Sequence, residues 1–179
     1  MLWCVDTFAW IDAVRLYNPA SPLFERLWGF LEQEIVAGRV ISPKAVHDEL
    51  REKTLRDSPP FAARVKRGKG CLFAEETPEL QERFMVIGNE YPDLTKKGKP
   101  FARSDADAWV VALAEIRGAI VVSQEKPKPS ATVPWKIPDV ASARGLTTAP
   151  LHEFLDSIQG LSTSRAQETT ADKQEGAPE

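Results

Sequence analysis

Short apolar runs alternate along the chain with longer segments in which apolar residues recur every three or four positions. The runs at 2–5, 39–43 and 119–123 have the length and composition of buried strands. The longer segments have the periodicity of amphipathic helices. Helices are therefore expected at 8–17, 23–37, 44–55, 78–92, 104–117, 138–145 and 149–159.

Glycines set the expected ends of three of these helices. Gly38, Gly118 and Gly145 each follow a periodic segment, where a residue able to adopt a left-handed conformation commonly ends a helix. Residues 71–76 are expected to form a short strand or turn, and residues 146–149 a last strand.

The alternation of strands and helices predicts the fold class. It favours an α/β protein with a mainly parallel sheet covered by helices on both faces, a three-layer α/β/α arrangement. In such folds ligands bind beyond the carboxyl ends of the strands. The predicted domain spans residues 1–160. From residue 161 to 179 apolar residues are nearly absent, so this tail is expected to be disordered.

Composition excludes several classes of protein. The formal charge of -3 gives no general basic coat, and the cysteines, Cys4 and Cys71, form neither a metal-binding pair nor a disulfide framework. No apolar segment is long enough to span a membrane, so a cytoplasmic protein is expected. The sequence contains no phosphate-binding or dinucleotide-binding glycine motif.

Carboxylates interrupt the apolar surroundings at the ends of several expected elements. Asp6 follows the first strand, Glu49 lies in the helix after the second, Asp105 and Asp107 open an apolar helix, and Glu125 follows a buried strand. Grouped carboxylates need a compensating cation, and oxygen ligands suit Mg²⁺ or Mn²⁺. Such ions support phosphodiester cleavage.

Each acid also has a simpler structural interpretation. Asp6 can be a helix N-cap, and Asp105 and Asp107 can complement a helix dipole. Residues two apart on a helix diverge, so Asp107, which shares a side with Val111 and Ala114, is the better ligand candidate. Glu49 alone would be a solvated residue of a polar helix. Only the set of acids indicates a site.

Basic segments could hold a phosphate backbone or could be solvated loops. Residues 51–69 carry seven Lys or Arg against two acidic residues, and the Pro59–Pro60 pair predicts that loops break this connection. The candidate phosphate contacts are Lys66, Arg67, Lys69, Lys96, Lys97 and Arg103.

The motifs together resemble the PIN-domain superfamily, typified by the VapC toxins of toxin–antitoxin modules. They are Asp6-Thr7 after a short strand, Glu49 in VHDEL, Asp107 in DAWVVALA and Glu125 in VVSQE. The pairing of VVSQE with the later WKIPDVASARGL resembles an uncharacterised PIN-like family of unknown function proposed to contain toxin ribonucleases.

The resemblance implies a three-layer fold and a metal-dependent ribonuclease. Asp6, Glu49, Asp107 and Glu125 would be the catalytic acids that hold Mg²⁺ or Mn²⁺, with Asp105 as an auxiliary. Thr7 resembles the hydroxyl residue that often follows the first acid. RNA would be the substrate, an antitoxin protein the partner, and a homodimer a further assembly. The fourth acid is usually Asp, whereas here it is Glu125.

Two other hypotheses remain open. A PIN-like module could bind RNA or a protein without cutting, in which case metal would leave its melting temperature unchanged. A receiver-like phosphoacceptor domain also gathers acids at strand ends and would need a lysine after a late strand, a position that Lys126 occupies.

Overall fold

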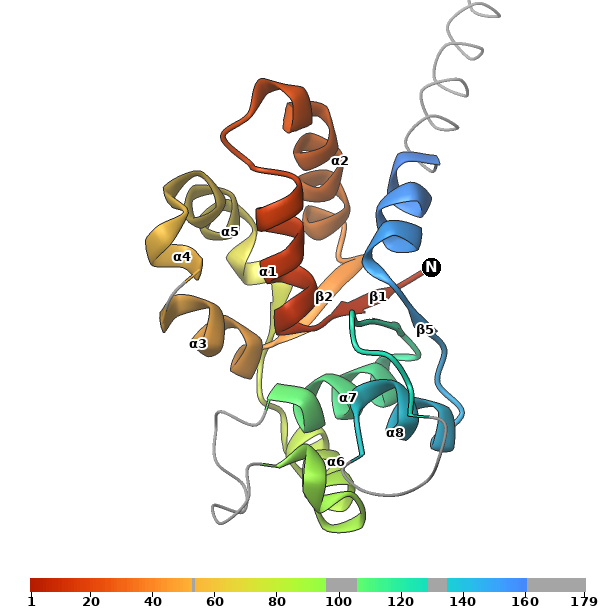
Figure 1. Cartoon of the computed structure of the whole chain (residues 1–179). Helices are drawn as coiled ribbons and strands as arrows, with labels where there is room; N and C mark the ends of the chain where they lie inside the picture. Colours follow the sequence, from red (N-terminus) through yellow and green to blue (C-terminus); the bar gives the residue numbers. More distant parts are fainter. Residues whose placement is uncertain (53, 96–105, 129–134, 161–179) are drawn as a thin grey trace, which may run out of the picture.

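The computed structural model describes residues 1–52, 54–95, 106–128 and 135–160 (Figure 1). The expected tail at 161–179 and the expected first two residues of the apolar helix, 104 and 105, lie outside these ranges.

A parallel sheet forms the centre of the molecule and confirms the expected fold class. Over the described residues the sheet has five strands in the order β3-β2-β1-β4-β5, and every neighbouring pair is parallel. The strands are β1 (Trp3–Val5), β2 (Val40–Pro43), β3 (Phe73–Ala74), β4 (Ile120–Val122) and β5 (Thr148–Ala149). The expected strands are all present, with bounds shifted by one or two residues.

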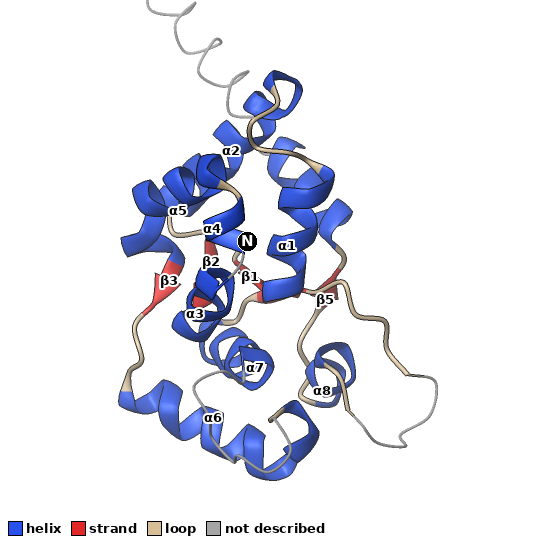
Figure 2. Cartoon of the chain, turned by 60° about the vertical axis from the view of Figure 1, so that its left-hand side comes forward, coloured by secondary structure: helices blue, strands red, loops and turns tan. Residues whose placement is uncertain are grey.

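Helices cover both faces of the sheet, as Figures 1 and 2 show. On one face lie α1 (Thr7–Leu16), α2 (Glu25–Val36) with a preceding 3₁₀ turn η1 (Pro22–Phe24), α3 (Lys44–Glu52), α4 (Thr54–Asp57) and α5 (Pro59–Leu72). On the other lie α6 (Pro78–Glu90), a 3₁₀ turn η2 (Pro92–Leu94), α7 (Ala106–Arg117) and α8 (Ile137–Ala143). Residues 151–160 form a further helix. None of the helices in these ranges has the length and apolar character needed to cross a membrane.

Glycine ends three helices, as the sequence predicts. Gly38, Gly118 and Gly145 adopt φ angles of 69°, 60° and 72°. This left-handed conformation is costly for residues with a Cβ atom. Each glycine lets the chain reverse directly into a strand.

Helix α7 is the central helix of its layer. Its residues from Ala108 to Ala114 are all buried, because one side contacts β1, β2 and β4 while the other packs on α6. Trp109 stacks on Phe84 of α6 with ring centroids 4.0 Å apart. This double burial explains why the segment is apolar all round.

The expectation of a loop-broken connection at 51–69 is wrong, because α4 and α5 occupy most of it. Proline is tolerated in the first turn of a helix, so Pro59 and Pro60 open α5 instead of interrupting the chain. Some of the basic side chains are also ion-paired. Arg64 bonds Glu25 and Glu32 of α2, and Arg67 bonds Glu32.

The strand order changes direction between β1 and β4. The chain moves outward from β1 to β2 and β3, then returns to add β4 on the other side of β1. Crossover connections diverge at such a point and leave an opening beyond the carboxyl ends of the two strands. Asp6 follows β1 there, and Glu125 follows β4.

Candidate functional site

Asp6 lies at the junction of β1, β4 and α1. Its backbone N–H donates to the carbonyl oxygen of Val122 at 3.1 Å, which continues the β1–β4 pairing for one residue beyond the strand. Its side chain caps α1, since Oδ1 accepts a hydrogen bond from the Thr7 N–H at 2.6 Å. Hydrogen bonds therefore hold both the backbone and the side chain of Asp6 in place.

The second oxygen of this carboxylate has no partner. Asp6 is fully buried, and among the described residues its Oδ2 is the buried side-chain atom without a hydrogen bond. Burial raises the pKa of Asp6 well above its ordinary value, and the negative charge of Asp107 raises it further. The Thr7 N–H opposes the rise and Glu125 adds to it. The site therefore disfavours the negative charge of Asp6 unless a positive charge compensates for it.

Asp107 and Glu125 lie near Asp6 and come from two different segments of the chain. Asp107 is the second residue of α7 and half-buried, on the side of the helix that carries the buried residues Val111 and Ala114. Glu125 lies three residues beyond β4, and its Oε2 accepts a hydrogen bond from the Ile137 N–H at 3.1 Å. Both acids contribute to the raised pKa of Asp6, so the three carboxylates share one electrostatic field.

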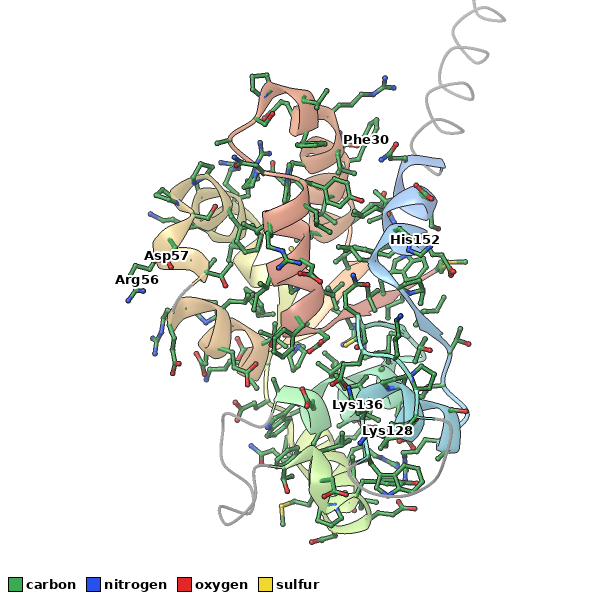
Figure 3. All side chains as sticks on the ribbon, in the orientation of Figure 1. Phe30, Arg56, Asp57, Lys128, Lys136 and His152 are labelled. Atoms are coloured by element: carbon green, nitrogen blue, oxygen red, sulfur yellow. The ribbon has the colours of Figure 1, made fainter. Side chains whose placement is uncertain are left out.

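Lys136 holds the other oxygen of Glu125. Its Nζ lies 3.5 Å from Glu125 Oε1, at the start of α8, where Figure 3 labels the side chain. The Glu125 N–H in turn donates to Ser123 Oγ at 3.2 Å. Asp139 accepts hydrogen bonds from the backbone N–H groups of Lys128 and Lys136, which makes it a structural cap at the start of α8.

Thr7 connects Glu49 to the same site. The Thr7 hydroxyl donates to Glu49 Oε2 at 2.6 Å, across the contact between α1 and α3. Thr7 follows Asp6 directly, so the hydrogen bond brings Glu49 close to the buried carboxylate. Below them, Ser42 Oγ donates to the Val5 carbonyl and accepts from Trp10 Nε1, which fixes α1 over β1 and β2.

The structure thus brings the four acids expected from the sequence to one edge of the sheet. Their donors are all oxygen, and the buried Oδ2 of Asp6 fits a hard cation such as Mg²⁺ or Mn²⁺. Over the ranges that the structure covers, no three Asp, Glu, His or Cys side chains are grouped closely enough to hold a metal ion as they stand. Asp105 lies outside the described residues.

The basic residues expected to contact phosphate are placed differently. Arg67 faces α2, where it pairs with Glu32, and Lys66 is an exposed residue of the same helix. The remaining members of the set, which are Lys96, Lys97, Arg103 and the side chain of Lys69, lie outside the described part of the chain.

Charged residues also line two grooves, which the sequence analysis did not predict. The α3 groove is lined by Lys44, His47 and Arg51, among others. These residues lie three, four or seven positions apart, a helical spacing that would have revealed a shared face beside Glu49.

The second groove, the Phe8 groove, is lined by Phe8, Asp12, Gln124, Glu125, Lys126 and Lys136 and has a volume of about 490 Å³. Phe8 belongs to the helix expected at 8–17, and it is 62% exposed. The polar residues Asp12 and Arg15, four and seven positions later, mark its side of α1 as solvent-facing.

Comparison with known proteins agrees with the extent of this fold. No curated protein matches the sequence. A family model described as a domain of unknown function (DUF4411) matches residues 3–160, a range that includes all four acids and ends with the last described helix. The chain therefore belongs to the DUF4411 family.

Proposed function

We propose that the protein is a metal-dependent endoribonuclease that uses Mg²⁺ or Mn²⁺. The observation that carries the proposal is the fully buried carboxylate of Asp6, whose Oδ2 has no hydrogen-bond partner among the described residues while Asp107 and Glu125 add negative charge around it. The buried Oδ2 and the negative charge around it lower the stability of the protein unless a cation or a proton compensates for them. The resemblance of the acidic motifs to PIN-domain nucleases supports RNA cleavage as the use of the ion.

The hydrogen bonds of the four acids suggest a role for each of them. Asp6 and Asp107 would hold the ion, with Glu49 oriented by the Thr7 hydroxyl. Glu125, fixed by the Ile137 N–H and Lys136, would bind a second ion or orient the attacking water. A bound Mg²⁺ or Mn²⁺ would supply Lewis-acid polarisation of the phosphate and lower the pKa of a bound water.

The cellular role follows from the same resemblance. We propose that the protein is the toxin of a toxin–antitoxin pair, acts in the cytoplasm and is held inactive by a protein antitoxin. A homodimer is the further assembly that the resemblance implies. These statements rest on the motifs around Asp6, Glu49, Asp107 and Glu125.

Cleavage of a mixed RNA pool by the purified protein, with Mn²⁺ or Mg²⁺ and with EDTA, tests the proposal. Cleavage should require the metal, and Asp6→Asn or Asp107→Asn should lower its rate by about 100-fold or more, because losing a direct ligand costs at least as much as losing an outer contact. Asp57→Asn is the control. Asp57 is exposed on α4 beside Arg56, away from Lys136 in Figure 3.

Equal rates for both site variants and the wild type would refute the site, and cleavage that persists in EDTA would refute the metal. RNA binding without cleavage under any metal condition would favour the alternative, a PIN-like module that binds RNA without cutting it.

A further inference from the structure

Phe8 is a solvent-exposed aromatic residue close to the acidic site. It lies in the first turn of α1 and is 62% exposed, whereas the neighbouring Ala9 and Trp10 are buried. Its backbone N–H helps to hold the Asp6 carboxylate, but its ring contributes nothing to the core. Single exposed apolar side chains are common on protein surfaces, so the feature that bears on function is the position of this ring beside the acidic site and not its exposure alone.

The surroundings of the ring are polar. Among the described residues that line the Phe8 groove, Phe8 alone is apolar. Glu125 forms part of the wall, so a molecule in the groove lies against the acidic site. Lys126 is exposed there and forms no ion pair within the described ranges.

Gln124 gives the groove a fixed polar wall. Its side-chain oxygen accepts from the Leu151 N–H at 3.0 Å, and its amide nitrogen lies 3.5 Å from Asp12 Oδ2. The groove thus offers one flat ring, one fixed amide, a carboxylate and a free ammonium group within a short distance of the acids. A protein interface instead requires a contiguous apolar area with few charges at its centre.

We infer that Phe8 is the stacking surface for a nucleobase of an RNA whose phosphate would be held at the acids through a bound cation, with Lys126 contacting the backbone. Stacking on an exposed aromatic ring is sequence-tolerant, because every base has an aromatic face. The identity of the ligand as RNA rests on the proposed function. The base-stacking role rests on the exposure and the polar surroundings of Phe8.

Binding of a fluorescently labelled 12-nucleotide RNA tests this inference. The assay contains Ca²⁺ in place of Mg²⁺ or Mn²⁺, so that an oxygen-ligated cation is present at the acids, and the RNA is checked on a gel to be uncut. Phe8→Ala should weaken binding by about 5- to 150-fold, the usual range for one stacked base, and Phe8→Trp should bind at least as tightly as the wild type. The variant keeps the backbone N–H that contacts Asp6. Leu23→Ala, which removes an 80% exposed apolar side chain elsewhere, is the matched control and should bind normally.

A series of RNAs, each lacking one base, separates stacking from indirect effects. At one position the missing base should abolish the difference between wild type and Phe8→Ala, as expected when two groups contact each other. Equal binding by both proteins at every position would overturn the inference. If Phe8→Ala leaves RNA binding unchanged and alters only the mass of a self-associated form of the protein, the inference is also overturned. Phe8 would then belong to a contact between copies of the chain.

Cleavage assays in Mn²⁺, run in parallel, separate this inference from the proposed function. Binding that depends on Phe8, without any cleavage, would refute the nuclease and retain the stacking role. Metal-dependent cleavage with a KM that Phe8→Ala leaves unchanged would support the nuclease and refute the stacking role. No binding of RNA by the wild type would refute both.

Discussion

Asp6 combines a structural task with a proposed chemical one. Its Oδ1 starts α1 by capping the Thr7 N–H, a contact that stabilises helices by about 1 kcal/mol. Its Oδ2 remains buried without a partner, which has the opposite effect on stability. The same residue therefore stabilises the helix start and destabilises the metal-free site, a conflict common at functional sites.

Replacing Asp6 with Asn should separate these two effects. Asparagine is an equally good N-cap, and it removes the buried charge beside Asp107 and Glu125. We expect the metal-free variant to be more stable than the wild type by roughly 1–2 kcal/mol, or about 2–8 °C in Tm. Thermal unfolding followed by circular dichroism in EDTA measures this.

The same experiment with added Mn²⁺ should reverse the order. The cation should raise the Tm of the wild type through binding to the folded state and leave that of Asp6→Asn unchanged. The control, Asp57→Asn, should follow the wild type in both conditions. A variant less stable than the wild type in EDTA would show that the carboxylate is satisfied in solution.

Helices α2 and α5 pack closely at a single glycine. A Cβ atom built on Gly68 would lie 2.7 Å from Cγ2 of Ile35, a side chain of α2 that is buried. Gly70, one half-turn later in α5, has nothing within 4 Å of such an atom. The close packing of α2 and α5 therefore requires a glycine at position 68 and does not require one at position 70.

Alanine at these two positions should change stability in opposite directions. Gly70→Ala should stabilise the protein by about 0.5–1 kcal/mol, since alanine is the better helix former. Gly68→Ala should destabilise it by about 1–3 kcal/mol, because the new methyl group forces Ile35 to move in a filled core. Urea denaturation of both variants checks the pair. Stabilisation by both changes would mean that α2 and α5 are less closely packed.

Arg144 joins three helices of the other layer. From the end of α8 its guanidinium donates to Glu115 of α7 at 2.5 and 2.9 Å and to Glu90 of α6 at 2.6 Å. The hydrogen bond from Arg144 holds the pKa of Glu115 below its usual value, against the opposing effect of partial burial. The ion pair between Arg144 and Glu115 therefore adds a polar link between α8 and α7 to the apolar packing of this layer.

The lowered pKa predicts how stability depends on pH. The pair should stabilise the protein fully above the ordinary glutamate pKa, and this contribution should be lost as the pH falls through the lowered pKa of folded Glu115. Glu115→Gln should reduce stability at pH 7 by about 1–3 kcal/mol and weaken the acid dependence. Urea denaturation between pH 3 and 7 tests this, with the exposed Glu153→Gln as control. Parallel pH curves for wild type and Glu115→Gln would contradict the prediction.

At the scale of the whole molecule, local patterns predict the elements and long-range contacts decide the rest. The parallel sheet follows from the spacing of apolar runs, and Gly38, Gly118 and Gly145 end helices where the sequence indicates. The α5 helix was missed because a proline pair can open a helix as well as break one.

The candidate site was predictable to a similar extent. Asp6 and Glu125 could be located because Asp6 directly follows β1 and Glu125 lies three residues beyond β4. No local signal gave the salt bridge from Lys136 to Glu125, which depends on how α8 returns to the sheet. The strand order that places β1 beside β4 is likewise a property of the assembled chain.

That strand order determines when the acids can meet during synthesis. The acids come from positions 6, 49, 107 and 125, and the partner strand of β1 on this side, β4, spans Ile120–Val122. A nascent chain still short of residue 125 has Asp6 beside an unpaired sheet edge and lacks Glu125 altogether. Because chains fold as their segments leave the ribosome, the protein cannot acquire its acidic centre until most of it has been translated.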